Sequence, residues 1–220
     1  LALLELVAEG KEKGWSKREV LRRAKEITGV YVPSMLAEGE RVTKAVYKDF
    51  EHAPYPLRPV VANTEAVHDR AVIELYRGCA SGCRFCQAGF WYRPIRERSP
   101  ERCAEYAKEI VNNTGYGEIA MCSLSTGDYS GLRPLMDGLR GFVHENKVNL
   151  SLPSLRLSSF SGDIAQESRR SSLTFAPEAG TQRLRNVINK NVTDAEIDNV
   201  AKAFEAGYDS VKPVSYTHLR

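Results

Sequence analysis

The sequence predicts an α/β protein in which parallel strands form a partial β/α barrel, preceded by a small helical and extended connector. Strands alternate with helical segments from residue 71 onward, which is the pattern of repeated strand–helix–strand units. Connections of this kind are right-handed, so the sheet that they build coils toward a barrel. A proline-rich run at residues 53–59 cannot be helical and marks the boundary with the connector.

The connector is expected to comprise residues 1–56. Two helical stretches are predicted within residues 1–27, and Ser16 with Glu19 forms a capping box at the start of the second. Basic residues alternate with acidic ones along this second stretch: Lys17, Arg18, Arg22, Arg23 and Lys25. We interpret them as a solvated helix face rather than an RNA-binding patch. Two short strands are expected next, at residues 30–32 and 41–47.

The core is expected over residues 57–213. Its strands are predicted at residues 71–76, 118–124, 149–157 and 172–176, with a final strand from residue 209. Its helices are predicted from Ser99, at residues 131–146, 163–168 and 181–188, and from Thr193. Ser99 is an N-cap followed by a proline, and Thr193 opens a second capping box.

These elements make about four and a half β/α units. An open parallel sheet that stopped there would leave a bare edge and uncovered helix faces, so we expect the barrel to continue beyond this chain, as in a fragment. The last residues, V-S-Y-T-H-L-R, are unlike the strand start before them and resemble a tail encoded by a sequencing adapter. We therefore expect residues 214–220 to be non-native.

The composition excludes several classes of protein. Its 31 basic and 28 acidic residues give a net charge of +3, too balanced to indicate nucleic acid or an anionic membrane as the main partner. No apolar run approaches the roughly 18–20 residues that span a bilayer. An odd number of cysteines, five in all, points to a reducing compartment with thiolates held as ligands. We expect a cytoplasmic protein.

Three of these cysteines, Cys79, Cys83 and Cys86, follow the strand at residues 71–76 with the spacing C-x3-C-x2-C. A structural zinc site usually takes two pairs of ligands, and the nearest further thiol, Cys103, lies in a predicted helix. A bacterial ferredoxin run has a different spacing and ends in proline. A disulfide would leave the third thiol unexplained.

Three closely spaced thiolates suit a cubane of four irons with one iron left open. The glycines at positions 78, 82 and 89 give the loop the backbone freedom to wrap around such a cluster. The position also suits a reactive group, because in a β/α barrel these lie on loops after the carboxyl ends of strands.

The spacing, with Phe85 just before the third cysteine, resembles the radical S-adenosylmethionine (radical SAM) superfamily. The resemblance implies a 4Fe-4S cluster on the three cysteines, whose open iron chelates S-adenosylmethionine. Reductive cleavage of that cofactor gives a 5′-deoxyadenosyl radical, which abstracts a hydrogen from the substrate. It also implies a reductant such as flavodoxin or ferredoxin, and no catalytic side chain beyond the cluster ligands.

The resemblance assigns further cofactor-binding residues besides Phe85. The turn of Thr126, Gly127 and Asp128 stands where the superfamily often has Gly-Gly-Glu, which receives the methionine amino group. Glu178 corresponds to the acidic residue that binds the ribose hydroxyls. The remaining two, at the carboxyl end of the third predicted strand, are Arg156 and Ser158.

A wider resemblance covers residues 50–213. Its motifs are R-G-C-x3-C-R-F-C-Q-A-G, Y-R-P-I-R-E-R-S-P-E, S-L-P-S-L-R and F-A-P-E-A-G-T-Q-R-L-R. They resemble an uncharacterised prokaryotic radical SAM family that usually carries a cobalamin-binding-like domain before the barrel. The connector would then follow a missing N-terminal domain, and cobalamin would be a possible further cofactor.

Three alternatives stay open for the activity. One is RNA modification of the methylthiotransferase type, and another is cobalamin-linked methyl transfer or rearrangement on a small molecule. The third is a non-catalytic module in which Cys103 closes a zinc or electron-transfer site. We expect Cys103 to pack within its helix and Cys122 to be a buried core thiol. Basic residues after the cysteine loop could meet an anionic substrate or line a domain interface: Arg93, Arg96 and Arg98.

Overall fold

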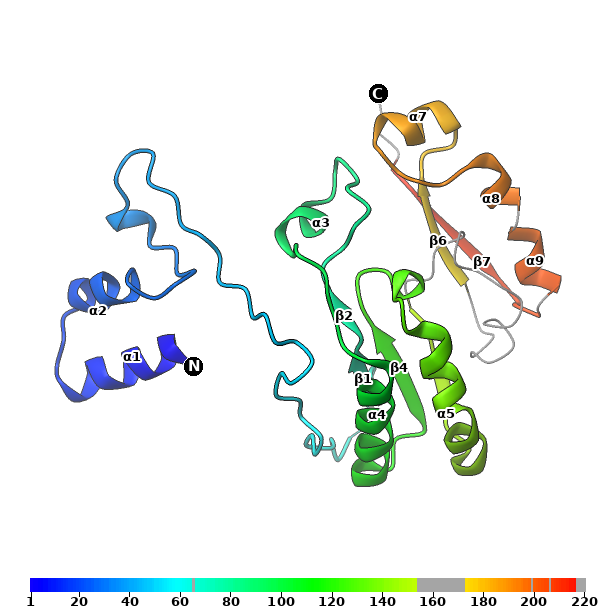
Figure 1. The fold of residues 1–220 in the computed structure, drawn as a ribbon, viewed down its shortest axis with the longest axis horizontal. Helices are drawn as coiled ribbons and strands as arrows, with labels where there is room; N and C mark the ends of the chain where they lie inside the picture. Colours follow the sequence, from blue (N-terminus) through cyan, green and yellow to red (C-terminus); the bar gives the residue numbers. More distant parts are fainter. Residues whose placement is uncertain (65, 154–172, 199, 206, 217–220) are drawn as a thin grey trace. The chain divides into compact units, whose positions relative to one another are not determined.

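The computed structural model describes residues 1–64, 66–153, 173–198, 200–205 and 207–216 (Figure 1). The chain divides into two compact units, Leu1–Lys48 and Asp49–Arg220. None of the helices in the described ranges has the length and apolar character needed to span a bilayer.

The first unit contains helices α1 (Ala2–Glu12) and α2 (Lys17–Ala24) and the short 3-10 helix η1 (Pro33–Met35). The predicted N-cap of α2 is confirmed, because the Ser16 hydroxyl accepts the Glu19 N–H at 3.2 Å. The Glu19 carboxylate, the other half of the predicted capping box, accepts from Arg22 and Arg23. The strands expected at residues 30–32 and 41–47 are wrong, since these residues have no strand structure. A β-strand requires a neighbour to complete its hydrogen bonds, and in the described part of this unit no such neighbour is present.

Basic residues of the first unit are paired with acidic ones. Arg22 and Arg23 both donate to the Glu19 carboxylate, which lowers the pKa of Glu19 to about 2. Lys25 contacts Glu40 at 2.9 Å. These pairs agree with a solvated helix face.

The second unit is built on a parallel sheet with the strand order β1-β4-β5. Its strands are β1 (Ala71–Glu74), β4 (Glu118–Cys122) and β5 (Asn149–Ser151). The register places Ala71 opposite Ile119, and Glu118 opposite Asn149. Figure 1 shows helices α4 (Pro100–Thr114) and α5 (Leu132–Asn146) side by side against this sheet. The predicted alternation of parallel strands and helices is therefore confirmed.

A second parallel pair consists of β6 (Leu173–Glu178) and β7 (Val211–Ser215). Between these strands, the described residues include the helical segments α7 (Gln182–Val187), α8 (Asp194–Asp198) and α9 (Val200–Glu205). The strands of the described ranges form separate sheets and close no barrel. The helix predicted at residues 163–168 lies outside the described residues.

Local capping sets the helix starts of the second unit. The Ser99 hydroxyl accepts the Arg102 N–H at 3.2 Å, with Pro100 as the first helical residue of α4. Thr193 and Glu196 cap α8 reciprocally, because each side chain accepts from the backbone N–H of the other. Both predicted caps are confirmed.

The core lies between the central sheet and its helices. Its fully buried side chains come from β1, β4, α4 and α5 and include Ile73, Ile119, Met121, Cys103, Leu135 and Leu139. Cys103 packs within its helix as predicted. Cys122 is exposed, so its predicted burial is wrong. It ends β4, and successive side chains of a strand point to opposite faces of the sheet, so it faces away from the core that Met121 enters.

Arg98 is a charged side chain of the second unit that is only 1% exposed. Its guanidinium lies 4.4 Å from the ring centre of Phe50 and 5.0 Å from that of Tyr55. It donates to the carbonyl oxygens of Glu74 and Phe50. The segment from Phe50 onward therefore packs on the second unit, ahead of the boundary predicted at residue 57. The domain division itself stays a prediction.

Burial raises the pKa of the Cys103 thiol to about 11, from about 8.5 in an unfolded chain. At pH 8 we therefore expect iodoacetamide to modify the exposed Cys122 and to leave Cys103 unmodified until denaturant is added. Peptide mass spectrometry measures both sites. Equal labelling rates at the two sites in the folded chain would contradict the burial of Cys103.

The raised pKa also links stability to pH. Because the folded state favours the neutral thiol, its contribution to stability is complete below about pH 8.5 and is lost as pH rises through about 11. The free energy of unfolding should fall more steeply between pH 8 and pH 10.5 in the unmodified chain than in Cys103→Ala. Parallel curves for the two chains would show that the thiol titrates normally.

Candidate metal and cofactor site

The cysteine loop connects the two strands of a small antiparallel sheet that is separate from the central sheet. It starts at β2 (Tyr76–Arg77) and ends at β3 (Arg96–Glu97), and the two strands pair antiparallel with Tyr76 opposite Glu97. Helix α3 (Gln87–Trp91) lies within it. The sequence predicts the outgoing strand, but a return strand of two residues is too short to show a periodic pattern.

Gly78 sets the close approach at the base of this loop. Its φ of 105° is in the region that favours glycine. A Cβ atom at this position would lie 3.0 Å from the Ile95 Cα and 3.0 Å from the Pro94 carbonyl oxygen. Because these neighbours are backbone atoms, they cannot rotate away. Only glycine therefore fits where the two arms of the loop meet.

The three predicted ligands lie on this one loop, and none of them forms a disulfide. Cys79 and Cys83 are buried, and Cys86 is partly exposed. The Cys86 sulfur accepts the Gly89 N–H at 3.4 Å and caps α3. Within the described ranges, no group of three or more His, Cys, Asp or Glu side chains lies close enough together to hold a metal ion. The structure thus places the three thiols on one loop without gathering them around a common point.

The donor set fits an iron–sulfur cluster. Cysteine sulfurs are the usual ligands of such clusters, and N–H groups that donate to these sulfurs tune their reduction potential. The loop offers three sulfurs, one of which already accepts a backbone N–H. Left-handed glycines at positions 78 and 82 give the loop backbone conformations that other residues rarely adopt. Cluster binding would require the three thiols to converge within this loop.

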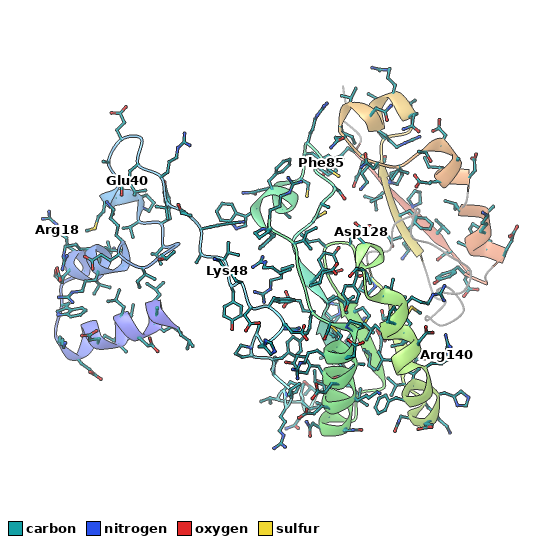
Figure 2. The ribbon with its side chains drawn as sticks, viewed as in Figure 1. Arg18, Glu40, Lys48, Phe85, Asp128 and Arg140 are labelled. Atoms are coloured by element: carbon teal, nitrogen blue, oxygen red, sulfur yellow. The ribbon has the colours of Figure 1, made fainter. Side chains whose placement is uncertain are left out.

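The turn after β4 contains the residues expected to receive the methionine amino group. Thr126 to Asp128 form the 3-10 helix η2. The Thr126 side chain is buried, and its hydroxyl donates to the Pro153 carbonyl at 2.7 Å, so it holds the turn. Asp128 is exposed. Figure 2 shows Asp128 and Phe85 beyond the same end of helices α4 and α5.

This turn is tied to the two strands at the base of the cysteine loop. The Tyr76 hydroxyl donates to the Ser125 carbonyl at 2.5 Å, and the Glu97 carboxylate accepts the Ser130 N–H at 3.2 Å. The Tyr129 hydroxyl donates to a carbonyl next to β3 at 2.6 Å. The strands at the base of the cysteine loop therefore also hold the turn after β4. Sequence reasoning gave these residues no role. Glu97 lies within the motif Y-R-P-I-R-E-R-S-P-E, but the motif does not show its contact with Ser130.

Glu178 ends β6 in an uncommon conformation. Its φ is 66°, a left-handed value that few residues other than glycine adopt. It is 8% exposed, and its carboxylate lies 3.5 Å from the Lys190 ammonium. Strained conformations of this kind are concentrated at functional sites. The structure thus places a buried carboxylate at the carboxyl end of a parallel strand, where the resemblance expects the ribose ligand.

The other residues predicted from the sequence differ in exposure and in contacts. The Phe85 ring is 40% exposed and packs edge-on against the Tyr216 ring at 5.1 Å. Arg156 and Ser158 lie outside the described residues. Arg98 is buried against the aromatic rings described above, so it does not face a substrate. The other two arginines after the loop donate to backbone carbonyls within it: Arg93 to Cys79, and Arg96 to Tyr92 and Pro94.

Comparison with protein families identifies the superfamily. Residues 73–219 match the family model of the radical SAM superfamily, a range that includes the whole cysteine loop. The chain belongs to the radical SAM superfamily. This membership implies S-adenosylmethionine-dependent radical chemistry as the class of activity.

Two individual proteins are similar to this radical SAM chain. An uncharacterized protein of Methanocaldococcus jannaschii is 31% identical over 197 residues, which make up 88% of this chain and 43% of the relative. The chain thus spans less than half the length of that relative. The crystal structure of methylornithine synthase (PylB) is similar with a TM-score of 0.45 at 13% identity, over 68% of this chain and 45% of that one.

Replacement of Gly78 by alanine should open the base of the loop. The new Cβ would clash with fixed backbone atoms, and strain of this kind costs about 1–3 kcal/mol. Amide hydrogen exchange in peptides covering residues 76–97 should become faster. Gly117→Ala is the matched control, because a Cβ at Gly117 meets nothing within 4 Å. Unchanged exchange in Gly78→Ala would show that the close approach is not required.

Proposed function

We propose that this chain is the core of a radical SAM enzyme in which Cys79, Cys83 and Cys86 hold a 4Fe-4S cluster. The observation that carries the proposal is the C-x3-C-x2-C spacing on a loop that follows a parallel strand, inside the range that matches the superfamily. When bound and reduced, the cluster with S-adenosylmethionine supplies a 5′-deoxyadenosyl radical that abstracts a substrate hydrogen.

The chain's own residues bind and orient these groups. The three thiolates leave one metal position without a protein ligand, which is the position available to the methionine amino and carboxylate groups. In the turn at Thr126, Gly127 and Asp128, the exposed Asp128 carboxylate is proposed to accept hydrogen bonds from the methionine ammonium. The buried Thr126 hydroxyl keeps that turn in place.

Glu178 is proposed to bind the ribose. A carboxylate can accept one hydrogen bond from each of two neighbouring hydroxyls, and such charge-assisted bonds are strong. Its low exposure supports this role, because a carboxylate shielded from water loses less to competition with solvent. Arg156, Ser158 and Phe85 are proposed as further contacts with the cofactor.

Cys103 favours an enzyme over a metal module closed by four cysteines. Its side chain is fully buried in the core on α4. Burial raises the pKa of this thiol to about 11, whereas a metal ligand must be a thiolate. A fourth ligand from this position would require the core to open.

The proposed cluster also indicates a cellular compartment and an electron donor. Free thiols that hold a cluster need a reducing compartment, so we propose a cytoplasmic location. The electron is proposed to come from a small redox protein such as flavodoxin or ferredoxin.

Anaerobic reconstitution tests the cluster. We expect about four irons per chain in the unmodified protein and in Cys103→Ala, and loss of bound iron when any loop cysteine is replaced by alanine. With dithionite and S-adenosylmethionine, the reconstituted protein should release 5′-deoxyadenosine, which chromatography detects. If the unmodified protein bound no iron, or if Cys103→Ala lost it, the proposed cofactor arrangement would be wrong.

The ribose contact is tested by Glu178→Gln. Hydrogen bonds to charged groups contribute about 1.5–3 kcal/mol, so the affinity of the reconstituted protein for S-adenosylmethionine should fall about ten- to a hundredfold. Equilibrium dialysis measures it. Glu105→Gln, which neutralises an exposed carboxylate paired with Arg102, should bind as the unmodified protein does. Unchanged affinity in Glu178→Gln would assign the ribose to another residue.

A further inference from the structure

The residues at the end of α7 contact the cysteine loop, although the two segments lie more than a hundred residues apart in the sequence. Helix α7 ends at Val187, and Asn189 follows with a left-handed φ of 54°. Asparagine is one of the few residues other than glycine that visit this conformation readily. The Asn189 side-chain amide donates to the Gly82 carbonyl at 2.9 Å and to the Ser81 carbonyl at 3.4 Å. Both acceptors lie between the first two cysteines of the loop.

The contact is reciprocal. The last carbonyls of a helix have no partner within it, and here the loop supplies one. The Arg84 N–H donates to the Ile188 carbonyl at 3.0 Å, and the Arg84 guanidinium donates to the Val187 carbonyl. A cation at this end also complements the negative end of the helix dipole. Each side thus satisfies polar groups of the other.

The left-handed conformation that ends a helix does not by itself explain the side-chain contacts of Asn189. Lys147 ends α5 with nearly the same conformation, φ 55°, and its backbone N–H bonds within its own helix. Asn189 differs because its side chain holds backbone groups that lie more than a hundred residues earlier in the chain. The contact therefore fixes part of the loop and not only the end of α7.

We propose that Asn189 is a positioning residue for the cluster, an inference that rests on the proposed function. The C=O and N–H groups of a trans peptide point in opposite directions. By holding the Ser81 and Gly82 carbonyls on one side of the loop, Asn189 directs the N–H groups of Gly82 and Cys83 to the other side. There they donate to cluster sulfurs and raise the reduction potential of the cluster.

The contact also joins the two parts of the proposed cofactor site. Asn189 and Glu178 lie at opposite ends of the same short segment, which leaves β6 and passes through α7. A hydrogen bond from Asn189 to the loop therefore restrains the cluster ligands relative to the carboxylate proposed for the ribose. Sequence motifs do not show this link, because the partners of Asn189 are backbone carbonyls.

The first experiment uses the metal-free chain. Asn189→Asp keeps the shape of the side chain and replaces its donor with an acceptor that faces two carbonyls. We expect N-ethylmaleimide to label Cys79 and Cys83 several-fold faster in this variant, with the exposed Cys122 as the internal reference. Asn146→Asp is the matched control, since that amide donates to a carbonyl within α5. Equal rates in Asn189→Asp and the unmodified chain would overturn the loop contact.

The second experiment uses the reconstituted protein. An EPR-monitored redox titration should give a more negative midpoint potential for Asn189→Asp and for Asn189→Gly. The glycine variant keeps the left-handed backbone and removes only the amide, so it separates the side chain from the helix end. An unchanged potential in both variants would overturn the positioning role.

The two proposals fail in different ways. If the unmodified chain binds no iron, the proposed function is wrong, and the labelling rates still decide whether Asn189 holds the loop. If the unmodified chain binds its cluster and both Asn189 variants keep its potential, only the positioning role is wrong.

Discussion

The antiparallel pairing of Tyr76 with Glu97 closes the base of the cysteine loop, and the rest of the candidate site depends on it. The loop leaves this two-stranded sheet at one of these residues and returns to it at the other, so the ends of the loop stay fixed. The same two side chains hold the turn after β4, through Ser125 and Ser130. Two separate parts of the proposed cofactor site are therefore supported by one pair of short strands. Gly78 permits the pairing, because no Cβ fits between the two arms.

Beyond its base, the loop buries Cys79 and Cys83 but leaves its outer part exposed. The aromatic side chains of its outer part are about half exposed, with 53% for Phe90 and 59% for Trp91, whereas Cys103 on the neighbouring α4 is fully buried. Segments with little apolar burial open at low free energy. This property suits a loop whose three thiols have to converge, because the binding free energy of a metal contributes directly to the order of its site. Contacts such as that of Asn189 with Gly82 limit the number of conformations that the loop adopts.

The elements that could be predicted are those whose cause lies within a few residues. The caps at Ser99 and Thr193 are hydrogen bonds over three positions, and the sequence alone predicts them correctly. The strands expected at residues 30–32 and 41–47 failed because a strand needs a partner, which a local pattern does not reveal. The burial of Arg98 was missed for a related reason. Two of its aromatic neighbours, Phe50 and Tyr55, lie more than forty residues earlier, just before and within the proline-rich run.

The candidate site likewise has features that the sequence predicts and features that depend on distant contacts. The spacing of the loop cysteines predicts the donors, because one loop contains all three, and it predicts the superfamily that the family comparison confirms. Their geometry does not follow from spacing: Cys86 is fixed by an N–H within α3, while the carbonyls before Cys83 are fixed by a residue more than a hundred positions later. A motif therefore records which atoms can bind a cluster. The distant contacts of the folded chain decide how the backbone amides around those atoms are oriented, and amides that donate to cluster sulfurs tune the reduction potential of iron–sulfur proteins.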